Sequence, residues 1–256
     1  MKIYDICTFN GESELFDIRY NILKDYVERF RVIEFDKTFS GKPKESTFNQ
    51  KYDKVEYFYI TEDIWGKYQA LAQSSPNTEY GRGAEHWVRE FCQKESIKDC
   101  LIDLKDDDLV FVGDCDEIWN PELTYVELPK KLKLQVYSYY LNNKSSEEFW
   151  GTLVAYYKDI KNQCLNHLRS DTKHRTEKEF GWHFTSMGGH ENVKKKLTDS
   201  YTEETYATRE VLDNLEQNIN GNVDFIGRHF DYKKDNSEHP EYLKQNVDKY
   251  LHLFTY

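Results

Sequence analysis

A short apolar run followed by closely spaced acidic residues is the feature of this 256-residue sequence that most constrains its fold. Residues 109–112 read LVFV, Gly113 follows, and Asp114 and Asp116 come next with one residue between them. Because the run is apolar at every position, we expect a strand buried on both faces, as in an α/β domain. Ligands of open α/β sheets bind at the carboxyl ends of the strands, so the two aspartates are predicted to face a ligand.

The spacing of the two aspartates suits a divalent cation. In a strand, side chains two residues apart point to the same side, and their Cα atoms lie about 7 Å apart. Two carboxylates at that spacing can hold one Mn²⁺ or Mg²⁺ ion, directly or through water, and such an ion can bridge a diphosphate. The alternative interpretation is a solvated acidic turn, because the Asp-x-Asp pattern is common.

The order of the expected elements indicates one α/β domain over residues 1–256. A strand, a helix and two further strands open the chain, which favours a mostly parallel central sheet flanked by helices. Strands are expected at 2–9, 31–35, 54–61, 108–117, 132–143 and 149–160, with a short aromatic stretch at 181–187. Helices are expected at 13–30, 83–99, 190–206 and 239–254.

Composition argues against several classes of function. Lys and Arg number 35 against 46 Asp and Glu, a formal net charge of −11, and the chain has no basic run. Binding to nucleic acid or to an anionic membrane therefore lacks support. The five cysteines show no C-x-x-C spacing, and no apolar run approaches the ~20 residues of a membrane span. We expect reduced thiols, no membrane span and a cytoplasmic location.

Four segments, taken in order, match the pattern of a known family. They are FNGESELFDIRYNIL (9–23), TFSGKPK (38–44) with Phe48, DDLVFVGDCDEI (107–118), and GWHF (181–184) leading to ENVKKKL (191–197). Together they resemble glycosyltransferase family 17, the family of β-1,4-mannosyl-glycoprotein β-1,4-N-acetylglucosaminyltransferases. The resemblance implies a GT-A type nucleotide-diphospho-sugar transferase fold. It also implies a metal-dependent, inverting transfer of a sugar, by family default GlcNAc, from a UDP-sugar to a glycan hydroxyl.

The resemblance further implies roles for single residues. Asp114 and Asp116 would be the metal-binding Asp-x-Asp, and His229 would add a late metal or phosphate contact. The residues expected to bind the donor are Phe9, Asn10, Glu12, Lys42, Arg89, Asp114, Trp182 and His183. Two of these residues have an alternative interpretation. Lys42 could be an exposed loop lysine, and His183 could be a hydrogen-bonded core histidine.

An inverting transfer needs a base that takes the proton from the acceptor hydroxyl. Many GT-A enzymes place this carboxylate at the start of the helix that follows a Gly- or Trp-rich loop. Here that position belongs to Glu191, and Glu204 is the second candidate. A carboxylate that caps the helix N-terminus is the alternative interpretation of Glu191.

Two other functions stay open at this stage. A metal-dependent phosphohydrolase or nucleotidyltransferase would use the same carboxylates and release phosphate without a sugar acceptor. A non-enzymatic glycan-binding module would use the 20 Tyr and 15 Phe residues and would ignore UDP and Mn²⁺. Animal members of the family are anchored in the Golgi, so a chain without a membrane segment is expected to act on a surface-glycan precursor, as in a bacterium or a virus.

Overall fold

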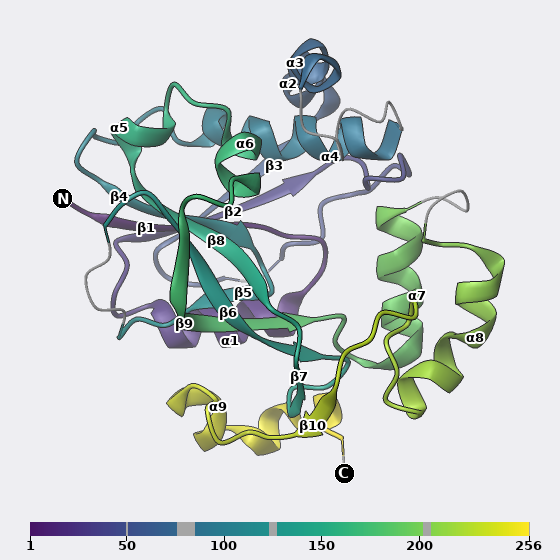
Figure 1. Ribbon diagram of the computed structural model, residues 1–256. Helices are drawn as coiled ribbons and strands as arrows, with labels where there is room; N and C mark the ends of the chain where they lie inside the picture. The colour runs from purple at the N-terminus through teal and green to yellow at the C-terminus, as the bar shows by residue number, and fades with distance from the viewer. Residues whose placement is uncertain (50, 76–84, 123–126, 202–205, 256) are drawn as a thin grey trace.

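The computed structural model describes residues 1–49, 51–75, 85–122, 127–201 and 206–255, and it shows a central β-sheet with helices on both faces (Figure 1). The strands are β1 (Ile3–Thr8), β2 (Arg29–Phe35), β3 (Val55–Ile60), β4 (Leu109–Asp114), β5 (Glu117–Trp119), β6 (Lys130–Ser138), β7 (Asn143–Ser145), β8 (Phe149–Tyr156), β9 (Arg175–Thr185) and β10 (Tyr232–Lys234). The helices are α1 (Ser13–Leu23), α2 (Glu62–Trp65), α3 (Gln69–Ser74), α4 (Glu85–Ser96), α5 (Tyr157–Ile160), α6 (Leu165–Ser170), α7 (Gly189–Ser200), α8 (Arg209–Asn220) and α9 (Glu241–Gln245). Short 3₁₀ helices cover Gly66–Tyr68, Ile97–Cys100 and Val247–Leu253. The predicted α/β class is confirmed.

The sheet is mixed in strand direction. β4, β1, β2 and β3 lie side by side and are parallel. Beyond β4 the order continues with β8, β6, β7 and β10, and these neighbours pair antiparallel. β9 pairs parallel to β6 and antiparallel to β5. The expected parallel arrangement therefore holds in the half built from β1 to β4. Elsewhere β6, β7 and β8 follow one another without the crossover helix that parallel pairing requires.

The first part of the chain follows the prediction closely, apart from one boundary. β1, β2 and β3 occupy the expected positions. The helix predicted over 13–30 ends at Leu23, because Arg29 and Phe30 already belong to β2 and pair with β1. Phe30 is buried in a strand rather than in a helix, so its place in the helical spacing was coincidental.

The later elements differ more from the prediction. The strand expected over 149–160 ends at Tyr156 and continues directly as α5. The helix expected over 239–254 is divided between α9 and a 3₁₀ helix. The aromatic stretch after Gly181 is the end of the long strand β9.

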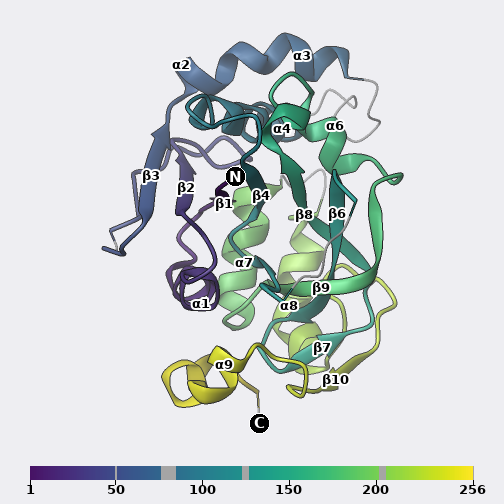
Figure 2. The same ribbon diagram turned by 90° about the vertical axis from the view of Figure 1, so that its left-hand side faces the viewer.

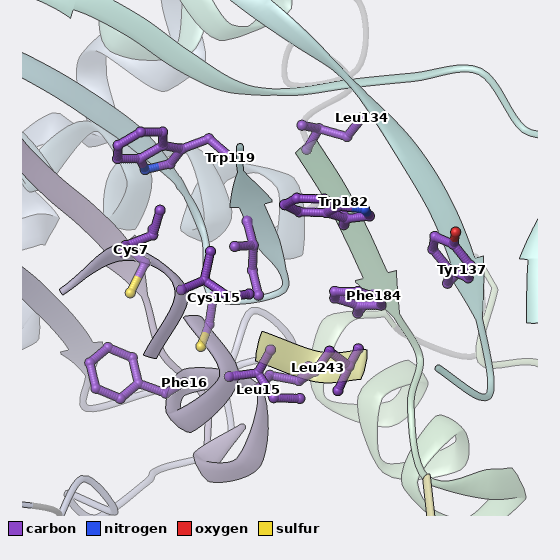
Figure 3. Packing of buried hydrophobic residues seen from close by; sticks show 14 of the residues in the cluster. Cys7, Leu15, Phe16, Cys115, Trp119, Leu134, Tyr137, Trp182, Phe184 and Leu243 are labelled. Atoms are coloured by element: carbon purple, nitrogen blue, oxygen red, sulfur yellow. The ribbon is translucent and has the colours of Figure 1, made fainter. Parts of the chain in front are cut away.

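Apolar clusters fill the space on both sides of the sheet. On one side, Cys7 and Phe111 belong to the cluster that includes the buried residues of α1, part of which Figure 3 shows. On the other side, Ile6 and Val112 belong to the cluster that includes Phe91 of α4. Neighbouring residues of β1 and β4 thus point to opposite faces, and both faces are covered. This explains why the run at the start of β4 is apolar at every position.

The parallel strands point toward a pair of helices near the C-terminal half of the chain. In Figure 1, β1 to β3 run toward the side on which α7 and α8 lie, and Figure 2 is turned by 90° so that the left-hand side of Figure 1 faces the viewer. Val193 and Leu197 of α7 pack with Leu215 and Ile219 of α8 in a small cluster of their own. Across the described ranges, no helix has both the length and the apolar character that a membrane crossing needs.

Candidate functional site

A cavity of about 620 Å³ lies at the ends of the parallel strands, where α7 packs beside them. Its lining combines the ends of β1 and β4, residues of α4 and α7, and the segment after α8. Asp114 and Asp116 both line it, as the sequence predicts. Asp114 ends β4 and Asp116 lies in the turn that follows, so the two carboxylates share the cavity although the strand has already ended.

Asp114 is held in its ionised form by its neighbours. Its Oδ1 accepts a hydrogen bond from Oγ1 of Thr8 at 2.9 Å, in register across the β1–β4 pair. Lys94 Nζ lies 3.4 Å from Oδ2, and an Nη2 of Arg169 lies 3.5 Å from Oδ1. Burial alone would raise the pKa of Asp114, but the positive charges of Lys94 and Arg169 outweigh it and hold the pKa well below its usual range.

Asp116 has a different pair of cationic neighbours. Lys196 of α7 donates from Nζ to Oδ2 of Asp116 at 3.1 Å, and Nε2 of His183 lies 3.6 Å from the same oxygen. Burial opposes ionisation here too, yet Lys196 and His183 keep the pKa of Asp116 well below its usual range. Both carboxylates of the pair are therefore charged at neutral pH.

A fully buried arginine holds the turn between Asp114 and Glu117 in place. Arg19 of α1 donates from Nε and Nη2 to the two carboxylate oxygens of Asp5, at 2.7 Å each. Its Nη1 donates to the main-chain carbonyls of Asp114 at 3.1 Å and of Glu117 at 2.5 Å. Trp119 Nε1 also donates to Asp5, at 2.8 Å. The path of the chain between the two aspartates is thus set by an ion pair between β1 and α1.

A buried glutamate lies directly beneath the pair. Glu117 is 2% exposed, and burial together with the charge of Asp114 raises the pKa of its carboxyl. Glycines leave the room for it: a Cβ on Gly113 would lie 2.5 Å from Oε2 of Glu117, and one on Gly151 would lie 2.6 Å from Cδ. Oε2 of Glu117 also accepts the main-chain N–H of Asp114 at 3.2 Å. The absence of a side chain at Gly113 therefore makes room for the carboxyl group of Glu117.

The predicted residues at the end of β1 lie in the cavity. Phe9, Asn10 and Glu12 all line it. The main-chain N–H of Asn10 donates to Oε2 of Glu12 at 2.5 Å, and Nζ of Lys44 donates to Oδ1 of Asn10 at 2.5 Å. Burial raises the pKa of Glu12. Lys44, which the sequence pattern did not single out, is thus the lysine of the SGKPK segment that reaches the cavity.

Two predicted basic residues have other partners. Lys42 is largely exposed and lies 3.5 Å from Asp199, outside the lining of the cavity. Arg89 donates from Nη1 to the main-chain carbonyl of Phe39 at 2.5 Å and does not meet Asp114. The residue of α4 that contacts Asp114 is Lys94, five positions later on the helix.

The two neighbours Trp182 and His183 separate because consecutive residues of a strand point to opposite faces. His183 lines the cavity and stacks on Phe149, with ring centroids 4.0 Å apart. Trp182 is buried in the apolar cluster of Figure 3, and its Nε1 donates to the main-chain carbonyl of Glu238 at 2.7 Å. Trp182 therefore supports the core beneath the cavity and does not line it.

Two further predicted residues, Glu191 and His229, do not reach the cavity. The side chain of Glu191 is 76% exposed and lies 3.2 Å from His190, consistent with the helix-terminus alternative. His229 is exposed, although its neighbour Arg228 lines the cavity. Glu204 lies outside the described residues. Within the part of the chain that the structure describes, no three His, Cys, Asp or Glu side chains form a ready metal-binding group.

Comparison with known proteins gives one extended match. The sequence model of the family described as glycosyltransferase family 17 matches residues 1–215. The β-1,4-mannosyl-glycoprotein 4-β-N-acetylglucosaminyltransferases of Rattus norvegicus and Homo sapiens are each 27% identical over 118 residues, which is 46% of this chain and 21% and 22% of theirs. The matched region thus spans about a fifth of the length of these curated relatives.

Among solved structures, an active-site mutant of LgtC is similar to this chain. It is 11% identical, with a TM-score of 0.33 over 65% of this chain and 61% of that one.

Proposed function

This chain belongs to glycosyltransferase family 17, and on that basis we propose that it is a metal-dependent, inverting glycosyltransferase of GT-A type. The donor is proposed to be a UDP-sugar, by family default UDP-GlcNAc, and the acceptor a hydroxyl group of a glycan. The observation that carries this proposal is the ionised pair Asp114 and Asp116 in a cavity at the carboxyl end of β4.

The donor set of the cavity fits a divalent cation. Asp114 and Asp116 supply two charged oxygen ligands, the kind that Mn²⁺ and Mg²⁺ prefer. Such ions keep several waters and share ligands with substrate phosphates, so two protein carboxylates are enough. When bound, the cation would neutralise charge on the departing diphosphate.

The rest of the lining suits a nucleotide and an acceptor. Lys44, Lys94 and Lys196 line the cavity and can bind phosphate oxygens, while Phe9 and Asn10 lie at the end of β1. The reaction also needs a base for the acceptor hydroxyl. We propose that role for a carboxylate that lines the cavity rather than for the exposed Glu191. Apart from Asp114, Asp116 and the buried Glu117, the carboxylates that line the cavity include Glu12, Glu147 and Asp199.

Calorimetric titration with UDP tests the proposal, first with Mn²⁺ and then with EDTA. We expect micromolar binding that depends on the metal and that is at least tenfold weaker in Asp116→Asn. Asp213→Asn, on an exposed face of α8, is the matched control and should bind as the wild type does. Metal-dependent binding that Asp116→Asn leaves unchanged would contradict the assignment.

A second assay separates the proposal from its rivals. Transfer from UDP-GlcNAc and other UDP-sugars releases UDP, whereas a phosphohydrolase that cleaves the diphosphate of the same UDP-sugar releases UMP and a sugar 1-phosphate. A glycan-binding module would bind sugars equally well with and without UDP and Mn²⁺. Release of UMP and a sugar 1-phosphate, without free or transferred sugar, would favour the hydrolase over the transferase.

A further inference from the structure

Lys196 places a positive charge directly on one of the two Asp-x-Asp carboxylates. Its Nζ donates to Oδ2 of Asp116 at 3.1 Å and to Oγ1 of Thr185 at 3.0 Å. Nε2 of His183 lies 3.6 Å from the same Oδ2. The oxygen of Asp116 that faces these groups is therefore already occupied by a cationic side chain of the protein itself.

Packing fixes the helix that carries Lys196, whereas the long side chain of Lys196 is partly exposed. Val193 and Leu197, on either side of it in α7, are buried against α8 and hold the backbone in place. The Lys196 side chain is 45% exposed, and a lysine stem has four rotatable carbons. Lys194, two positions earlier on α7, is exposed and does not line the cavity.

A divalent cation on Asp116 would compete with the ammonium group for this carboxylate. Mg²⁺ binds carboxylate oxygens at about 2.1 Å, and two positive charges so close together repel each other. We therefore expect binding of the cation to move Nζ of Lys196 away from Asp116. The diphosphate of a nucleotide donor would offer the displaced ammonium group new anionic oxygens in the same cavity.

Building on the function proposed above, we propose that Lys196 is an exchangeable counter-ion of the Asp-x-Asp pair. It neutralises Asp116 in the free protein, gives up this carboxylate to the divalent cation, and then binds the diphosphate of the donor. Lys196 thereby acts as a positioning residue for the donor. Its removal should strengthen binding of the metal alone and weaken binding of the nucleotide, two effects of opposite sign.

Mn²⁺ binding measured by electron paramagnetic resonance tests the first effect on the whole chain. Lys196→Met is expected to bind Mn²⁺ alone about tenfold more tightly than the wild type, which corresponds to about 1.4 kcal/mol. Lys194→Met, at an exposed lysine of the same helix that does not line the cavity, is the matched control and should match the wild type. With saturating Mn²⁺, calorimetry should show that Lys196→Met binds UDP about tenfold more weakly. A variant that failed to fold would lose both kinds of binding and would not reproduce this pattern.

Each of the other possible results would contradict a specific part of the proposal. If the wild type binds Mn²⁺ and Lys196→Met binds it equally or more weakly, the counter-ion role is overturned while the metal-dependent transferase stands. If neither protein binds Mn²⁺, both the counter-ion role and the metal dependence of the proposed function fall. If Lys196→Met binds Mn²⁺ more tightly but keeps wild-type affinity for UDP, the step onto the diphosphate is overturned.

Discussion

The buried ion pair between Arg19 and Asp5 should be the most sensitive point of the fold and of the site together. Both side chains are fully buried, and Arg19 also donates to the main-chain carbonyls of Asp114 and Glu117. In Arg19→Met, the carboxylate of Asp5 stays buried and keeps the hydrogen bond from Trp119 Nε1 but loses both bonds from the guanidinium. Removing one partner of a buried ion pair is expected to destabilise a protein by about 3–5 kcal/mol.

Urea unfolding of Arg19→Met, followed by circular dichroism, measures this loss of free energy. Arg209→Met is the control, because Arg209 is almost fully exposed and pairs with Asp213 on the surface of α8, where little change in the unfolding midpoint is expected. A loss of less than about 1 kcal/mol in Arg19→Met would refute the reasoning that breaking the pair leaves an uncompensated buried charge on Asp5.

A double variant separates stability from the geometry of the turn. In Arg19→Met with Asp5→Leu, two apolar side chains replace the buried charges, and most of the lost stability should return. The carbonyls of Asp114 and Glu117 still lack their donor. We therefore expect a folded protein that binds UDP with Mn²⁺ at least tenfold more weakly. Wild-type affinity in the double variant would show that Arg19 does not position the turn.

Three further predictions follow from the surroundings of the pair. Gly151→Ala should destabilise the protein by about 1–3 kcal/mol in urea unfolding, because its Cβ would overlap the carboxyl of Glu117; an unchanged midpoint would show that this carboxyl can move aside. Glu191→Gln should keep kcat within about twofold in a sugar-transfer assay, because the side chain lies outside the cavity, whereas a loss of a hundredfold or more would restore it as the base. The pKa of Asp116 is depressed in the folded state, so its charge stabilises the fold above the unfolded pKa of about 3.9 and this contribution is lost as the pH falls further. The thermal midpoint of Asp116→Asn should thus lie below that of the wild type at pH 7, and a gap that persisted undiminished at pH 3 would contradict the depressed pKa.

Local patterns in the sequence were sufficient for the strand and the acidic pair that it carries. An apolar residue at every position of 109–112 indicates burial on both faces, and Gly113 marks the end of the strand. Asp114 and Asp116 then follow within a few residues, so their common location in the cavity depends on little more than the local backbone. The residues at the end of β1 were assigned from the resemblance to the family, and the tertiary structure brings them to the same cavity by placing β1 beside β4.

Strand alternation and helix phase determine which of the predicted side chains face the cavity, and the order of residues in the sequence did not reveal this. Trp182 and His183 are adjacent in sequence, yet only His183 lines the cavity. On α4 the helix phase turns Arg89 toward Phe39 and Lys94 toward Asp114. The presence of a charged residue in the apolar stretch around Arg19 was a usable signal for a buried ion pair, but it did not reveal what the guanidinium binds.

What the sequence determined by itself was the class of fold and the place of two carboxylates at the end of a buried strand. Which cations meet those carboxylates was decided by the tertiary structure. Lys196 is 80 residues from Asp116 along the chain, and Arg19 is 95 residues from Asp114. These pairs form because the strand order places β1 beside β4 and because α7 packs against the cavity at their ends. Contacts at such separations depend on the packing of whole elements, which short-range apolar periodicity does not encode.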